Sequence, residues 1–149
     1  MIKKIKNNKK LYLDLLLLGD EQESMIDRYL NRGEMFALFD NNILKTVCVV
    51  TNEGNGICEL KNIATYPQFQ RQGCAKKLIK FIFKYYKNNY NTIRVGTSET
   101  PSTINFYKNC GFIESHRIQN FFIDNYNHLI FENGEQLIDM IYFSKELNK

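Results

Sequence analysis

The first thirty residues carry apolar positions at helical spacing. Residues 4–18 begin as a short strand and continue into a helix that places Leu11, Leu15 and Leu18 on one side. Residues 21–30 repeat the spacing, so a second helix is expected there.

Apolar and β-branched runs between residues 34 and 65 are typical of strands. They predict strands over residues 34–39, 43–51 and 57–65. Polar turn residues separate them at 40–42 and 53–56, and the first turn indicates a hairpin. The three strands are therefore expected to form a meander.

The second half of the chain alternates between helix and strand. A helix over residues 75–86 carries its lysines opposite its apolar stripe, and a short buried strand follows over 92–97. Pro101 suits the first turn of another helix, and Gly111 suits the left-handed residue that ends it. The closing elements are two strands and the loop between them, over residues 114–123, 139–147 and 124–136.

Length and composition agree with one globular domain. The 149 residues are 44% apolar and 13% aromatic, which is enough for a single core without a metal or disulfide staple. The order of elements predicts an α/β fold over residues 1–149, with a mixed central sheet of about six to seven strands flanked by about four helices.

The net charge of +4 comes from two short patches. Residues 1–10 carry five lysines and no acid, and residues 70–94 carry seven basic side chains and no acid. The stretches 11–69 and 95–149 have net charges of −5 and −3. Because the net charge without the first ten residues is −1, no general affinity for polyanions is indicated.

The N-terminus resembles a secretory signal only in outline. Asp14 interrupts the apolar run, and Asp20 and Glu21 stand where a small-residue cleavage site is expected. No segment approaches the roughly 20 apolar residues of a membrane span. We therefore expect a cytoplasmic protein without a membrane partner. The four cysteines have no CxxC pair and no histidine at ligand spacing, so free thiols and no metal site are predicted.

One segment between a predicted strand and a lysine-rich helix has the features of an anion-binding turn. It comprises Gln70, Arg71, Gln72, Gly73, Cys74, Ala75 and Lys76. Backbone N–H groups at a helix start bind phosphate oxygens where no side chain blocks the approach. Gly73 supplies that clearance, Arg71 adds a forked charge, and Lys76 attracts a polyanionic tail. The pattern matches neither GxxxxGK[ST] nor GxGxxG, so a P-loop or dinucleotide fold is not indicated.

A second segment, Tyr107-Lys108-Asn109-Cys110-Gly111-Phe112, follows Gly73 by 34 residues. Together the two segments resemble the GNAT superfamily of acyl-CoA-dependent N-acetyltransferases. In that family a Gln/Arg-x-x-Gly-x-Gly/Ala turn binds the pyrophosphate of acetyl-CoA, and a Tyr-x-x-x-Gly-Phe segment follows one strand later. The resemblance covers most of the chain, and the closing segments RVGT, FYKNCGF, IFENG and DMIYFSKEL resemble small bacterial GNAT proteins whose acceptor is poorly defined.

The resemblance implies direct transfer of an acetyl group from acetyl-CoA to a primary amine of a small molecule, peptide or protein. Tyr107 is the candidate acid at the CoA sulfur, and Glu59 is the candidate base, acting through water. Packing in the core is the alternative role of Tyr107. A solvated or salt-bridged strand position is the alternative for Glu59.

The resemblance also implies how the cosubstrate is held. The backbone of Ile63, Ala64 and Thr65 is expected to pair with its amide arm as an added strand does. Family members commonly carry an asparagine seven residues before the tyrosine, where this chain has Thr100. Asn105 or Thr100 is expected to supply the missing polar contact.

Three function classes are open at this stage. The leading one is an acetyltransferase, and the second is a non-catalytic acyl-CoA-binding regulator. The third, nucleic-acid binding through the two basic patches, lacks a recognised motif. The acidic stretches are compatible with a cationic acceptor, and Phe121, Phe122 and Tyr126 are expected either to line its pocket or to pack in the core. Because late strands often pair between subunits in this superfamily, a homodimer is a further expected arrangement.

Overall fold

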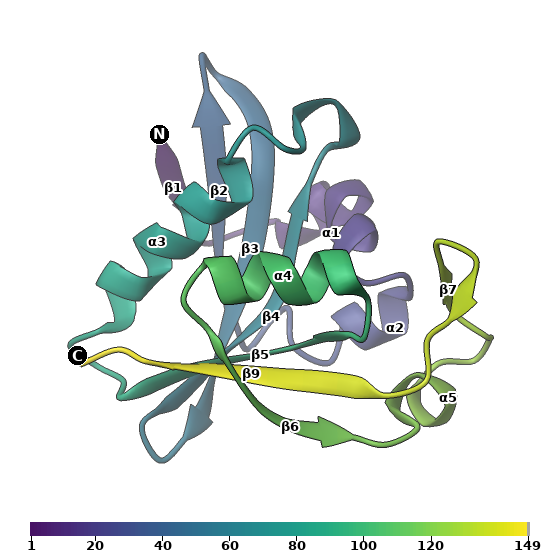
Figure 1. The fold of residues 1–149 in the computed structure, drawn as a ribbon. Helices are drawn as coiled ribbons and strands as arrows, with labels where there is room; N and C mark the ends of the chain where they lie inside the picture. Colours follow the sequence, from purple (N-terminus) through teal and green to yellow (C-terminus); the bar gives the residue numbers. More distant parts are fainter. Residues whose placement is uncertain (149) are drawn as a thin grey trace.

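The computed structural model describes residues 1–148, in which one mixed sheet is covered by helices on both faces (Figure 1). Within these residues seven strands form the sheet, in the order β1-β2-β3-β4-β5-β9-β6, and β4 and β5 are its parallel pair. Its strands are β1 (Ile2–Ile5), β2 (Glu34–Asp40), β3 (Ile43–Gly54), β4 (Ile57–Thr65), β5 (Thr92–Ser98), β6 (Ile113–Ile118) and β9 (Met140–Glu146). A separate hairpin is made of β7 (Phe131–Glu132) and β8 (Glu135–Gln136). The helices are α1 (Leu13–Gly19), α2 (Glu23–Ile26), α3 (Cys74–Tyr86), α4 (Pro101–Asn109) and α5 (Phe121–Asn125), with 3-10 turns at Lys9–Tyr12 and Pro67–Phe69.

The two faces of the sheet hold two separate cores, as the period of two along its strands requires. On β2, Phe36 and Leu38 belong to the core under α3 and α4, whereas Met35 and Ala37 belong to the core under α1 and α2. The predicted α/β fold with a mixed sheet is confirmed, with five α-helices among residues 1–148.

The N-terminal helices are shorter than the sequence pattern predicts. The side chains of Leu11 and Leu18 are 78% and 52% exposed, so the predicted apolar stripe of this helix is wrong at these two positions. Leu15, the third residue of that stripe, is buried together with Leu16, because a 3-10 turn precedes α1 and shifts which face meets the sheet. The second helix spans four residues, Glu23–Ile26, although the residues that repeat the apolar spacing over 21–30 are buried, namely Met25, Ile26, Tyr29 and Leu30.

The segment that follows β6 differs from its predicted form. A strand was expected over residues 114–123, but β6 ends at Ile118 and α5 begins at Phe121. Asn120 breaks the strand, because its backbone is left-handed with φ 58° and its N–H donates to Asp139 Oδ1 at 2.9 Å. Phe122 of α5 then packs into a small cluster with residues of the predicted loop, which itself contains the β7–β8 hairpin.

The parallel strands β4 and β5 separate along their length. Their ladder ends at the pair Leu60–Val95, although β4 continues to Thr65 and β5 to Ser98. The register of β4 against β3 shifts at Lys61, an extra residue that bends β4. The separation therefore leaves one edge of β4, from residue 61 to residue 65, unpaired with β5.

Three of the five lysines of residues 1–10 have hydrogen-bond or ion-pair partners within the fold. Lys4 pairs with Glu34, and Lys10 pairs with Glu23 and with Asp27. Lys9 Nζ donates to the carbonyl oxygens of Leu30 and Gly33 at 2.9 and 2.6 Å. These contacts connect the N-terminal segment to α2, to the residues that follow α2 and to the start of β2. The first basic patch therefore has a structural role.

The Lys9→Ala variant is expected to lower the free energy of unfolding by about 1.5 kcal/mol, because two carbonyl groups lose a charged donor. Urea unfolding followed by circular dichroism measures this change. Lys6→Ala is the matched control, since Lys6 is exposed, and its effect is expected within about 0.5 kcal/mol. Equal effects of the two substitutions would contradict the role of Lys9.

Candidate active site

Two cavities of opposite charge open where β4 and β5 separate. The basic cavity, of about 600 Å³, lies between the end of β4, the start of α3 and α4, and its charged lining residues are Arg71 and Lys76. The acidic cavity, of about 410 Å³, is lined by Asp20, Glu21 and Glu132, and Lys61 is the one basic residue among residues 1–148 that lines it. The two cavities share Ile63, Thr103 and Tyr107 in their walls.

The turn before α3 has the geometry of the predicted anion-binding segment. Gly73 is the N-cap of α3 with φ 82°, and Arg71 also has a left-handed φ of 63°. A Cβ added at Gly73 would meet no atom of the protein within 4 Å, so this side of the turn faces open space. Gly73 and the first residues of α3 line the basic cavity, so the positive end of the helix dipole lies beside it, where anions are favoured.

Tyr107 occupies the junction of the two cavities. Its ring packs edge-on against Phe112 at 5.7 Å between ring centroids, and α4 ends two residues later at Asn109, before Gly111, whose φ is 102°. Among residues 1–148 its hydroxyl has no hydrogen-bond partner, and the residue is 7% exposed. Burial raises the pKa of Tyr107 above its ordinary value, so the hydroxyl stays protonated and able to donate. Both predicted roles, packing and a donor at the site, are compatible with this position.

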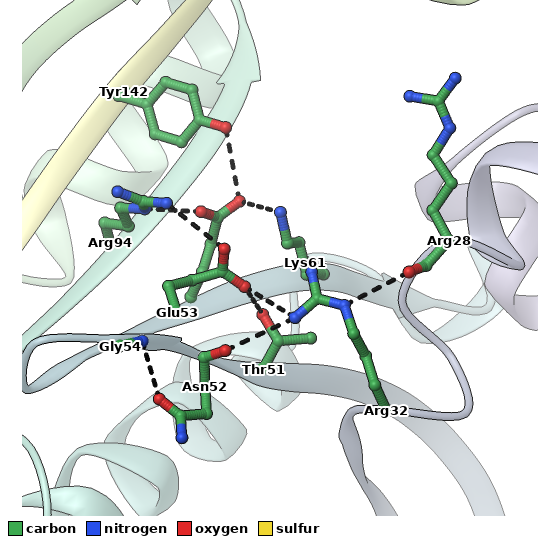
Figure 2. Close-up of polar contacts among 10 residues, drawn as sticks. Arg28, Arg32, Thr51, Asn52, Glu53, Gly54, Lys61, Arg94 and Tyr142 are labelled. Atoms are coloured by element: carbon green, nitrogen blue, oxygen red, sulfur yellow. Dashed lines mark hydrogen bonds and ion pairs between the residues drawn. The ribbon is translucent and has the colours of Figure 1, made fainter.

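Glu59 lies in a buried ion-pair network beside the site. Its Oε1 accepts from Arg94 Nε at 2.6 Å, and its Oε2 lies 2.8 Å from Lys61 Nζ. Arg94 stands opposite Glu59 in the parallel register of β4 and β5. Figure 2 shows that Arg94, Lys61 and Tyr142 gather here, with Glu53 linking Arg94 to a further arginine, Arg32. Glu59 faces a third cavity of about 210 Å³, which adjoins the acidic one and shares six lining residues with it.

The other predicted binding residues divide into two groups. The lining of the basic cavity includes Ile63, Thr65, Gln70, Arg71, Gly73, Cys74, Ala75 and Lys76. It does not include Gln72, whose side chain donates to the Gln68 carbonyl at 3.3 Å, nor Asn105, which is exposed on α4. Ala64 packs into the core under α1 and α2. Thr100 is buried, and its hydroxyl donates to Thr103 at 2.8 Å.

Sequence reasoning missed Asp20 as a site residue. It follows α1 and lines both the acidic cavity and the third cavity, where Tyr126 joins it. Tyr126 donates to Asp20 across 106 positions of sequence, a distance that no local spacing could indicate. Phe122 and Tyr126 line the acidic cavity and also pack together, so their positions are compatible with both predicted roles.

Comparisons with known proteins agree with this geometry. A family model described as an acetyltransferase (GNAT) domain matches residues 31–114. An uncharacterized N-acetyltransferase of Bacillus subtilis, YvbK, is 35% identical over 136 residues, which cover 90% of this chain and 87% of that protein. A GNAT family acetyltransferase from Elizabethkingia anophelis, crystallised with acetyl-CoA bound, aligns with a TM-score of 0.93 and 33% identity over 98% of this chain and 97% of its own. A Bacillus subtilis acetyltransferase in complex with CoA aligns with a TM-score of 0.90 and 30% identity over 97% of each chain. The chain therefore belongs to the GNAT family of acetyltransferases, and it is an acyltransferase by family.

Among residues 1–148 every helix is too short or too polar to span a membrane. The same residues contain no group of three or more His, Cys, Asp or Glu side chains placed to hold a metal ion.

Proposed function

We propose that this chain binds acetyl-CoA in the basic cavity and transfers its acetyl group directly to a primary amine held in the acidic cavity. The observation that supports this most is the meeting of two oppositely charged cavities at Tyr107. A donor with a pyrophosphate suits the basic cavity, and an amine that is cationic at neutral pH suits the acidic one. One site at their junction then holds both reactants at once.

The donor fits the residues of the basic cavity. Arg71, Lys76 and the first N–H groups of α3 would hold the pyrophosphate, with Gly73 leaving room for it. The unpaired edge of β4 would pair with the amide arm, as an added strand pairs with a sheet edge. Acetyl-CoA supplies the activated thioester.

The chemistry needs a proton donor at the leaving sulfur. The free Tyr107 hydroxyl lies at the shared wall, and its raised pKa keeps the proton available at neutral pH. As the amine nitrogen forms its bond to the acetyl carbon, the carbon–sulfur bond breaks and Tyr107 protonates the thiolate.

Glu59 is proposed as the base that takes the amine proton through water. Because Arg94 and Lys61 already pair with its carboxylate, this role requires the Lys61 pair to open during the reaction. The ion pairs also give Glu59 a structural role. One variant distinguishes the structural role from the catalytic one.

The Glu59→Gln variant is expected to lower the free energy of unfolding by about 3 kcal/mol, because it removes the buried carboxylate that pairs with Arg94 and Lys61. If Glu59 is the base, kcat falls about 100-fold at a temperature where the variant is folded. Thermal unfolding and steady-state kinetics measure the two effects. Exposed Glu114 gives the control Glu114→Gln, which should leave both unchanged. A destabilised variant with full kcat would assign Glu59 to structure alone.

Two measurements test the proposed function against its alternatives. Isothermal titration should show acetyl-CoA binding at micromolar or tighter affinity, and CoA release should depend on an added amine. Binding without CoA release over a broad amine panel would favour a non-catalytic regulator. No binding at all would end the proposal. Nucleic-acid binding is disfavoured because three lysines of the first basic patch are bonded within the fold.

A further inference from the structure

Asp20 is a carboxylate held by two neutral donors in the wall of the acidic cavity. Its Oδ1 accepts from the Tyr126 hydroxyl at 2.6 Å, and its Oδ2 accepts from the Tyr29 hydroxyl at 3.1 Å. Arg28 is near enough to favour its charged form, but among residues 1–148 no cationic group lies within ion-pair distance of this carboxylate. Glu59 differs, because it already has two cationic partners.

The orientation of the Asp20 carboxylate is fixed by a buried amide. Asn62 Nδ2 donates to the Leu16 carbonyl at 3.0 Å and to the Tyr29 hydroxyl oxygen at 3.1 Å. Because Tyr29 accepts from Asn62, its single hydroxyl proton is directed at Asp20. The carboxylate is therefore held in one position before any substrate arrives.

The same amide brings α1 close to β4. A Cβ added at Gly19 would lie 2.2 Å from Asn62 Oδ1, so only glycine allows this approach immediately before Asp20. Asn62 is 3% exposed, and its Oδ1 has no hydrogen-bond partner within residues 1–148. Both Gly19 and Asn62 line the acidic cavity beside Asp20.

A partly buried carboxylate without a counter-ion is unfavourable in the unliganded protein, since desolvation favours its neutral form. That cost is removed when a cation binds against it. The acidic cavity contains Tyr107 as well as Asp20, so a cation at Asp20 lies in the same cavity as the proposed acid.

We propose that Asp20, positioned by Tyr29 and Tyr126, is the residue that binds the ammonium group of the acceptor, which selects cationic primary amines. This inference rests on the proposed function. The ammonium supplies the ion-pair partner that Asp20 lacks, and the charge-assisted hydrogen bond places the nitrogen in the acidic cavity, whose wall includes Tyr107.

The test compares the wild type with Asp20→Asn and Asp14→Asn. Asp14 is the matched control, because it lies on α1, close to Asp20 in sequence, and also accepts a tyrosine hydroxyl, that of Tyr66 at 3.0 Å, but lines neither cavity. The probes are benzylamine, tyramine, cadaverine and the N-terminus of a short peptide, with neutral aniline for comparison. Asp20→Asn is expected to raise KM for the cationic amines about 10- to 100-fold and to remove their preference over aniline. The Kd of acetyl-CoA should not change in either variant.

The pH dependence of kcat/KM is a further measurement, and a purely structural role of Asp20 would leave it unchanged. Burial raises the pKa of Asp20, and the Tyr126 hydrogen bond opposes this rise. The acid limb of kcat/KM for the amine therefore lies above the ordinary range of an aspartate, and Tyr126→Phe should move it to still higher pH. The ionisable groups around Asp20 and its phenols are Tyr29, Tyr126, Arg28, Glu21, Lys61 and Glu132.

The outcomes separate this inference from the proposed function. If the wild type acetylates these amines and Asp20→Asn keeps the wild-type KM and preference, the inference is overturned and the acetyltransferase stands. A wild type that binds acetyl-CoA but acetylates none of the amines contradicts both. A KM increase for Asp14→Asn as large as that for Asp20→Asn would also overturn the role of Asp20.

Discussion

Gly73→Glu is expected to weaken acetyl-CoA binding at least about 100-fold, because it places a carboxylate where the pyrophosphate would lie at the start of α3. Gly73 lines the basic cavity, and a Cβ added there meets no protein atom within 4 Å. Loss of binding would therefore come from charge and bulk in the anion site. Isothermal titration of the folded variant measures the effect.

Gly54→Glu is the control for backbone strain in this experiment. Gly54 has φ 84°, close to the 82° of Gly73, and a Cβ there also meets nothing within 4 Å. Both variants place a non-glycine residue in the left-handed region and should lose similar stability, on the order of 1 kcal/mol. Gly54 lines neither cavity, so its variant should bind acetyl-CoA normally. Equal binding by the two variants would remove the turn before α3 from the donor site.

Tyr107→Phe is expected to lower kcat about 100-fold while KM for acetyl-CoA stays within a few-fold, because the leaving thiolate loses its proton donor. Since its pKa is raised, ionisation of Tyr107 should not lower kcat of the wild type up to about pH 10. Steady-state kinetics over this pH range measure both effects.

Tyr86→Phe is the control for loss of a buried hydroxyl. Tyr86 packs in the same core as Tyr107, but its hydroxyl donates to Glu34 at 2.7 Å and lies outside both cavities. This variant should lose stability and keep kcat. Full activity of Tyr107→Phe would restrict Tyr107 to packing, the other role its burial allows.

Elements with a strong period and clear ends could be predicted from the sequence. The strand 57–65 was predicted with the bounds of β4, and the predicted helix 75–86 differs from α3 by one residue. The hydrophobic pattern predicts the wrong element where tertiary contacts decide the conformation. Asn120 takes a left-handed backbone and bonds to Asp139, which turns a predicted strand into α5.

The two segments that carry the family resemblance are local in sequence, and both lie at the cavities. The acceptor side is different, because its wall is assembled from residues far apart in the chain. The bond between Asp20 and Tyr126 and the pairing of Glu59 with Arg94 depend on the packing of α1 and on the register of β4 and β5. Neither follows from spacing along the sequence.

The account is tested most directly by mass spectrometry of the amine after incubation with the chain and acetyl-CoA, together with initial rates measured while both substrates are varied. Direct transfer at a shared junction predicts an amine that gains one acetyl group, CoA released in equal amount, and intersecting double-reciprocal lines. Bound acetyl-CoA with no acetylated amine, or parallel lines that indicate an acetylated enzyme intermediate, would contradict it.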